Sequence, residues 1–155
     1  MHQQILFVKN IVESEGGRLR HVKPHGALYH DVLQQEELAN CFMEGVRSVD
    51  PELSIYGMAG SSFGKACTTA GFRFVPEAFG DRRYESGLSL RSRDNDDALI
   101  DSEADFQAHL RRLLSGSVVD VHGNANPLTV DTICIHSDTP HAVKFAQLAH
   151  AAIKA

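Results

Sequence analysis

The residues best suited to chemistry lie in three short stretches, and the first of these is residues 21–31. This stretch contains Lys23 and His25 in a Lys-Pro-His-Gly turn. Cationic donors of this kind can hold a substrate carboxylate or stabilise negative charge that develops on a carbonyl oxygen. A structural alternative is that Lys23 pairs with a carboxylate and that His25 caps the next helix.

The second stretch places two carboxylates and a guanidinium close together. Glu77, Asp81 and Arg82 follow an apolar segment, and Arg91 lies further along a charged loop. Arg82 could clamp a substrate carboxylate or a phosphate through two parallel hydrogen bonds. The alternative is an ion pair that only holds the loop, and a charged loop residue such as Arg91 is usually solvated.

The third stretch is His136 and Asp138, which follow the apolar segment 131–135. An imidazole and a carboxylate at this spacing could act as an acid–base pair or as metal ligands. A catalytic zinc site usually has three protein ligands, and this pair is one short. We therefore predict no metal site from these residues.

The elements that position these stretches follow from hydrophobic spacing and from turn residues. Strands are expected at 18–23, 54–58, 72–76 and 131–136, and a small hairpin is expected at 118–121 and 128–130. Helices are expected at 2–15, 31–50, 62–70, 102–116 and from 139 to the end, with a long exposed loop over 86–101. The repeated order of strand, turn and helix predicts right-handed βα units around a parallel sheet. Ligands bind at the carboxyl ends of such strands, where all three stretches are expected.

The length predicts an incomplete barrel. A closed (β/α) barrel takes about 250 residues, so the 155 residues of this chain support about five units at most. The chain also begins with a helix, as though a preceding strand were missing. We expect an α/β fold of about four parallel strands plus the hairpin, in a single domain over residues 1–155.

Composition excludes several classes of protein. The formal net charge of −5 argues against a nucleic-acid-binding surface. No apolar run is long enough to span a membrane and no secretory signal is present, so a cytoplasmic location is expected.

Cys41, Cys67 and Cys134 are predicted to be reduced core residues. Five histidines are predicted to face solvent, namely His2, His109, His122, His141 and His150.

Three motifs in order closely resemble the LamB/YcsF family, whose members are also called the A subunit of 5-oxoprolinase. They are Val22–Tyr29, Glu77–Tyr84 with Gly87, Leu88 and Arg91 beyond it, and Thr132–Pro140. The resemblance runs from near residue 1 to the end of the chain. It implies an irregular (β/α) barrel related to the glycoside hydrolase and deacetylase barrels.

The resemblance also implies an activity, partners and site residues. Family members open 5-oxoproline, a lactam, to L-glutamate with ATP and Mg, together with subunits B and C. The implied catalytic residues are Lys23, His25, Glu77, Asp81, His136 and Asp138, and the implied substrate-binding residues are Arg82, Arg91 and Tyr29.

Other motifs of the family are absent from the chain. These are an acidic, asparagine-containing strand motif, an Ala-Cys-Gly-Phe-His-Ala-Gly-Asp-like segment and a Gly-Ala-His-Pro-like segment. The chain therefore resembles the C-terminal part of the family fold.

Two alternatives to a role in 5-oxoprolinase follow. One is an inactive remnant whose open barrel edges are covered by self-association, which would make it a homo-oligomer. The other is a metal-dependent hydrolase of the deacetylase-like barrel type.

Overall fold

The computed structural model describes residues 1–154 and divides the chain into two compact units, Met1–Pro76 and Glu77–Ala155. Four strands form a parallel sheet in the order β1-β2-β3-β6, and β4 and β5 form a separate two-stranded sheet. This confirms the predicted α/β class, the four parallel strands and the hairpin. Strand β3 (Phe74–Phe79) begins in the first unit and ends in the second.

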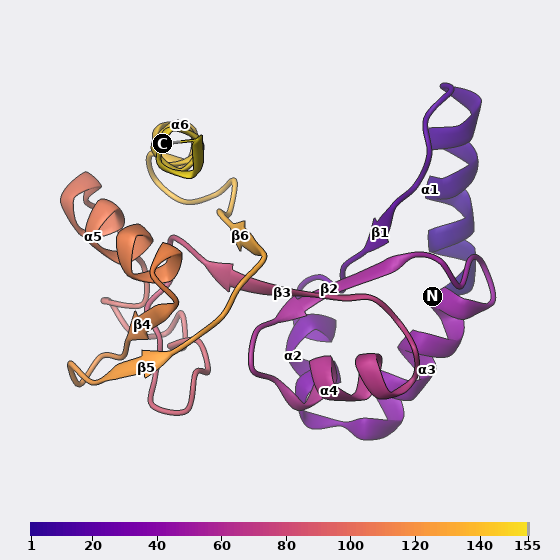
Figure 1. The fold of residues 1–155 in the computed structure, drawn as a ribbon, viewed down its shortest axis with the longest axis horizontal. Coiled ribbons are helices and arrows are strands. Elements are labelled where there is room, and N and C mark those ends of the chain that lie inside the picture. Colours follow the sequence, from indigo (N-terminus) through magenta and orange to yellow (C-terminus); the bar gives the residue numbers. More distant parts are fainter. Residues whose placement is uncertain (155) are drawn as a thin grey trace. The chain divides into compact units, whose positions relative to one another are not determined.

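The first unit packs helices against one side of its strands. It contains α1 (His2–Ser14), β1 (His21–Val22), α2 (Ala27–Gln34), α3 (Glu36–Arg47), β2 (Ser54–Met58) and α4 (Ser62–Thr69). Strand β1 pairs in parallel with β2, and α2, α3 and α4 gather on one side of β2 (Figure 1). Phe42, Val46, Ile55 and Phe63 form the centre of this core. Gly64 lets α4 approach closely, since a Cβ there would lie 2.6 Å from the ring of Phe74.

The second unit contains the end of β3 with α5 (Glu103–Leu114), β4 (Ser117–Val119), β5 (Ala125–Pro127), β6 (Thr132–Cys134) and α6 (Ala142–Lys154). Strands β3 and β6 are parallel, with Glu77 opposite Thr132. Helices α5 and α6 pack through Phe106 and Phe145, whose rings stack with centroids 4.1 Å apart. Both rings are fully buried.

The predicted helix over 31–50 is wrong in its bounds, because the structure has two helices there. Gly26 has a φ of 61°, a conformation that favours glycine, and it turns the chain into α2 at once. Gln35 is extended and separates α2 from α3. The turn that carries His25 is consequently shorter than predicted.

Strand β3 does not end at Pro76 as predicted but continues to Phe79. Pairing with β6 carries it on, so Glu77 is a buried strand residue rather than part of the following loop. The strands predicted at 18–23 and 131–136 are in contrast shorter, at His21–Val22 and Thr132–Cys134.

The hairpin is also shifted from its predicted position. The Asp120 carboxylate accepts hydrogen bonds from the backbone N–H groups of Asn124 and His122 and closes the turn early. The second strand of the hairpin therefore starts at Ala125 rather than at Leu128.

Two further predictions of burial are wrong. Cys41 is exposed and Cys134 is half-buried, so only Cys67 of the three cysteines lies in the core as predicted. His109 is buried rather than solvent-facing, and its Nε2 lies 3.0 Å from the carbonyl oxygen of Phe79. No helix within residues 1–154 combines the length and the apolar character that crossing a membrane requires.

Candidate active site

The pairing of β3 with β6 brings Asp81 and His136 together. Phe79 lies opposite Cys134, and the next backbone bond runs from the Gly80 N–H to the Cys134 carbonyl at 2.9 Å. Both strands then end, and the residues that follow them turn toward each other. The side chains of Asp81, His136 and Thr139 meet there, and we call these three residues the Asp81 cluster.

The Asp81 carboxylate is fully buried and accepts three hydrogen bonds. The donors are the His136 backbone N–H at 2.8 Å, the His136 Nδ1 at 3.0 Å and the Thr139 hydroxyl at 2.5 Å. Burial alone raises the pKa of Asp81, but the hydrogen bonds from His136 and Thr139 outweigh burial and hold this pKa below its usual value. Asp81 is therefore an ionised buried carboxylate at neutral pH.

Asp81 also determines how His136 presents its ring. Because the carboxylate only accepts, Nδ1 carries the hydrogen, which leaves Nε2 of the neutral ring as an acceptor. The ring stacks on Phe79 with centroids 5.6 Å apart and an angle of 15°. Within residues 1–154, Nε2 has no hydrogen-bond partner, and the side chain is 26% exposed. His136 is thus a proton acceptor in a fixed orientation with access from solvent.

Arg82 lies next to this cluster and is almost fully buried. Its Nη2 donates to the Arg91 carbonyl oxygen at 2.6 Å, and its Nε–H is buried without a hydrogen-bond partner within residues 1–154. Burial is the main reason that its pKa is lowered, followed by the nearby charge of Arg93. Arg82 thus binds the Arg91 segment and keeps one buried donor without a hydrogen bond.

Arg91 and Asp138 lie in ion pairs outside the cluster. The Arg91 guanidinium contacts Glu85 at 2.7 Å and Asp97 at 2.6 Å. Asp138 accepts from Arg93 at 2.9 Å, and both side chains are exposed. These contacts support the structural alternative for Arg91, and they pair Asp138 with Arg93 rather than with His136.

Lys23, His25 and Tyr29 form a second group at the end of β1, which we call the Lys23 group. The Lys23 ammonium lies 5.7 Å from the centre of the Tyr29 ring, a cation–π distance. Lys23 and His25 line a hollow of about 660 Å³, together with His21 and apolar residues of α1 and α2. The first unit therefore brings the two predicted cationic donors to one cavity.

No group of three or more His, Cys, Asp or Glu side chains placed to hold a metal ion is found among residues 1–154. Glu77 is 3% exposed within β3. Its burial takes it out of the loop where the sequence placed it, whereas Asp81 and Arg82 do follow the strand.

Sequence reasoning missed three residues around the cluster. Thr139 was expected only to start a helix, yet its hydroxyl binds Asp81 and α6 starts later, at Ala142. The buried Tyr84 hydroxyl accepts the Phe79 N–H at 2.8 Å. His109 could have been found from spacing, since Phe106, His109, Leu110 and Leu113 form the i, i+3, i+4, i+7 stripe of a buried helix face.

Comparison with known proteins identifies the family. The sequence profile of the LamB/YcsF family matches residues 1–155. The chain belongs to the LamB/YcsF family. This confirms the resemblance that the three motifs indicated.

Two relatives show what this LamB/YcsF protein is similar to within the family. The A subunit of 5-oxoprolinase from Bacillus licheniformis is 40% identical over 146 residues, which cover 93% of this chain and 57% of that protein. The crystal structure of a lactam utilization protein from Thermus thermophilus matches with a TM-score of 0.87 at 29% identity. That match covers 99% of this chain and 63% of the other. The chain thus spans about three fifths of the length of these relatives.

Proposed function

We propose that this LamB/YcsF chain acts in the ATP-dependent opening of 5-oxoproline to L-glutamate. The observation that carries the proposal is the Asp81 cluster, in which a buried carboxylate orients a solvent-accessible histidine. An imidazole whose Nε2 is held as an acceptor suits the activation of water. The Bacillus licheniformis relative, a 5-oxoprolinase component at 40% identity, supports the choice of substrate.

The proposed chemistry assigns one proton acceptor and one donor. Nε2 of His136 takes a proton from water as the water oxygen bonds to the lactam carbonyl carbon. The lactam oxygen, phosphorylated by ATP with release of ADP, stays on this carbon. Loss of the amine breaks the C–N bond and leaves an acyl phosphate, which a second water hydrolyses to the carboxylate and phosphate. His136 returns the proton to the leaving nitrogen, so the first water is divided between the new carboxyl group and the new amine. Asp81 stabilises the imidazolium in between.

Cationic side chains are proposed to hold the anionic groups of the substrate. Arg82 supplies positive charge beside the Asp81 cluster for the substrate carboxylate. Lys23 and His25 are candidate donors to an anionic group within the first unit's own hollow. ATP, when bound, would activate the unreactive amide by phosphorylating its oxygen. Since residues 1–154 show no metal-binding group of acidic or histidine side chains, we assign no step to a metal held by this chain.

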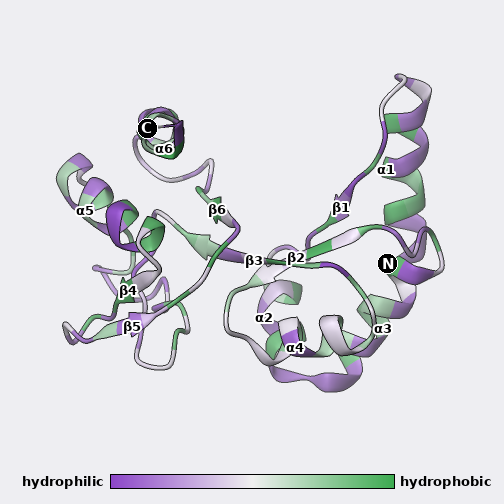
Figure 2. Ribbon diagram, viewed as in Figure 1, coloured by the Kyte–Doolittle hydropathy of each residue, from purple (hydrophilic) through white to green (hydrophobic). Residues whose placement is uncertain are grey.

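The proposed partners are 5-oxoprolinase subunits B and C, with a second copy of the chain as a further partner in a cytoplasmic assembly. Self-association is supported by α1, which presents Phe7 at 67%, Ile11 at 48% and Val8 at 47% exposure. Figure 2 shows hydrophobic segments along this helix. Exposed apolar residues gathered on one helix mark an interaction surface.

The direct test is coexpression with subunits B and C, followed by an assay of ATP-dependent glutamate formation from 5-oxoproline. We expect turnover that falls by about 10²–10⁴-fold in His136→Ala, the usual contribution of a general base. The matched control is His150→Ala, which removes an exposed histidine on α6 and should leave turnover unchanged. Absence of turnover, with a full-length relative active in parallel, would overturn the proposal.

A further inference from the structure

A second hollow in the first unit lies at the amino ends of the strands. It has a volume of about 280 Å³, and its lining includes Arg20, Ser54, Tyr56 and Arg73. Arg20 directly precedes β1, Ser54 is the first residue of β2, and Arg73 directly precedes β3. The proposed lactam chemistry uses residues at the carboxyl ends of strands, so it leaves this hollow without a role.

Three guanidinium groups line this hollow without a direct ion pair among residues 1–154. The side chains of Arg18, Arg20 and Arg73 make no hydrogen bond or ion pair within residues 1–154. The carboxylates of Asp50 and Glu52 also line the hollow, so three arginines face two carboxylates, and Asp50 already binds Lys9 at 3.4 Å. The hollow therefore carries an excess of positive charge.

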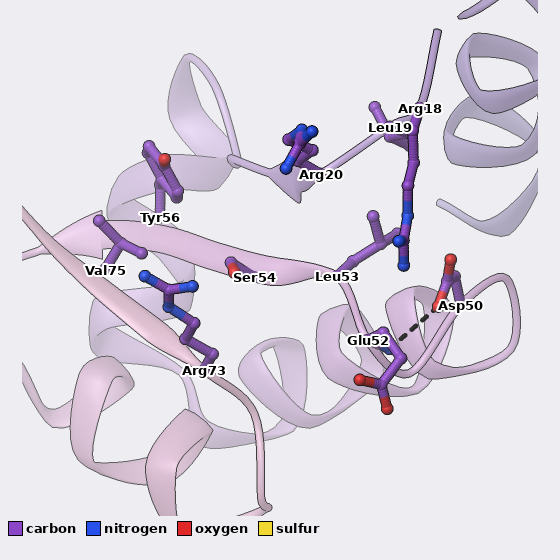
Figure 3. A pocket seen from close by; sticks show the side chains of 10 residues that line it. All are labelled: Arg18, Leu19, Arg20, Asp50, Glu52, Leu53, Ser54, Tyr56, Arg73 and Val75. Carbon is purple, nitrogen blue, oxygen red and sulfur yellow. Dashed lines mark hydrogen bonds between the residues drawn. The ribbon is translucent and has the colours of Figure 1, made fainter. Parts of the chain in front are cut away.

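The side chains are arranged as donors around a common space. Figure 3 shows Arg20 and Arg73 on either side of β2, the strand that carries Ser54 and Tyr56. The Tyr56 ring is held by stacking on His21, with centroids 4.1 Å apart. Two guanidinium groups and two hydroxyl groups can together donate hydrogen bonds to the oxygens of a tetrahedral anion.

We propose that this hollow, which we call the arginine hollow, binds a phosphate group. Its volume of about 280 Å³ is below the range of about 300–1,000 Å³ typical of pockets that enclose drug-sized ligands. A single phosphate, free or at the end of a larger molecule, suits this size better than a whole nucleotide. The inference does not depend on the proposed lactam chemistry, and it adds a site to the chain.

Calorimetric titration of the chain with inorganic phosphate at low ionic strength tests the proposal. We expect saturable binding at one site with a Kd of about 1 mM or tighter. The affinity should fall as NaCl is added, because salt screens exposed charges. Absence of saturable binding would overturn the proposal.

Substitutions locate the site. Arg73→Gln should weaken phosphate binding by about tenfold, or about 1.4 kcal/mol, and Arg73→Lys should retain part of the affinity because it keeps the charge. The control is Arg111→Gln, which removes an exposed arginine on α5 and should leave binding unchanged. Because Arg73 is exposed and makes no side-chain bond within residues 1–154, a melting curve should show that Arg73→Gln still folds. Equal effects of Arg73→Gln and Arg111→Gln would overturn the assignment.

Further titrations distinguish the source of the phosphate. Inorganic phosphate, tripolyphosphate, ATP and adenosine are compared on the chain and on the Arg20→Gln/Arg73→Gln double variant. The proposal holds if the phosphate-bearing ligands bind, adenosine does not and the double variant loses the binding. ATP tighter than inorganic phosphate would point to a nucleotide as the source, and equal affinities would point to the free anion. Adenosine that binds as well as ATP would overturn recognition of the phosphate.

Discussion

Replacing Asp81 by Asn tests the Asp81 cluster most directly. The substitution keeps the size of the side chain but replaces one carboxylate oxygen by an NH₂ group and removes the charge. Three donors converge on the carboxylate. At least one of them, the Nδ1–H of His136, would then face a donor. His136 is expected to move its proton to Nε2, so that Nδ1 can accept from the new amide.

The size of the effect follows from these hydrogen bonds. A hydrogen bond to a charged group contributes about 1.5–3 kcal/mol, and a neutral one contributes about 0.5–1.5 kcal/mol. The difference is about 1–1.5 kcal/mol per bond, so loss of the charge from all three bonds of the buried Asp81 predicts a loss of about 3–4.5 kcal/mol of unfolding free energy at pH 7. The change of tautomer removes the acceptor at Nε2 and predicts a fall in turnover of about 10²–10⁴-fold.

The stability difference should depend on pH in one direction. The pKa of Asp81 in the folded chain lies below its value of about 3.9 in an unfolded chain. Its contribution to stability is therefore fully present above about pH 4, and it is lost as the pH falls through the folded pKa. The difference between the native chain and Asp81→Asn should be constant from pH 7 to about pH 5 and shrink in stronger acid.

Urea unfolding followed by far-UV circular dichroism measures this difference, since the chain has no tryptophan to report by fluorescence. Asp101→Asn is the control, because Asp101 is exposed. Its unfolding free energy should match that of the native chain at neutral pH. The reasoning is refuted if Asp81→Asn is as stable as the native chain at pH 7, or if the difference does not change in acid.

Three other residues and one surface give further predictions. Thr139→Val should lower the unfolding free energy by about 1.5–3 kcal/mol in urea melts, because it removes one bond to a buried charge, and an unchanged midpoint would contradict this. Hydrogen bonds from Asn124, and then from neighbouring groups, lower the pKa of Asp120 to about 2. Asp120→Asn should therefore lower Tm at pH 7, with a difference that shrinks below about pH 4 and not above it. Gly26→Ala should lower the unfolding free energy by about 1–3 kcal/mol, because glycine there has a φ of 61°; an unperturbed melt would argue against strain at this turn. Phe7→Ser should reduce the mass measured by light scattering if α1 mediates self-association, and an unchanged assembly would exclude α1 from the contact.

Local patterns were sufficient for much of the fold. The strand at Ser54–Met58 has the predicted bounds, and α1, α4 and α5 differ from prediction by a residue or two at their ends. These elements have a clear apolar period. Their helices begin after capping serines, such as Ser61 and Ser102, or are followed by glycine. The element bounds that were wrong lack such local signals. The end of β3 depends on pairing with β6, and the hairpin depends on the bonds of Asp120.

The sequence predicted which residues follow the strand ends better than it predicted which of these residues contact each other. Asp81 and His136 were singled out from their positions after apolar segments, and they do meet. Asp138 was expected beside His136 because it lies two residues away, but the turn directs it to Arg93. Sequence separation along a turn does not determine where side chains point, so this partner could not be predicted.

The sequence by itself determined the parallel α/β class, the family and the types of residue available for chemistry. These depend on periodicity and on motifs, which are local properties of the chain. Only the tertiary structure decided that Thr139 and His136 both donate hydrogen bonds to Asp81 and that His109 is buried. It also decided that Arg91 forms an ion pair with Glu85 of the same loop. Each of these contacts joins residues that are distant in sequence or lie in irregular turns. Their geometry is determined by strand register and by the need to satisfy buried polar groups.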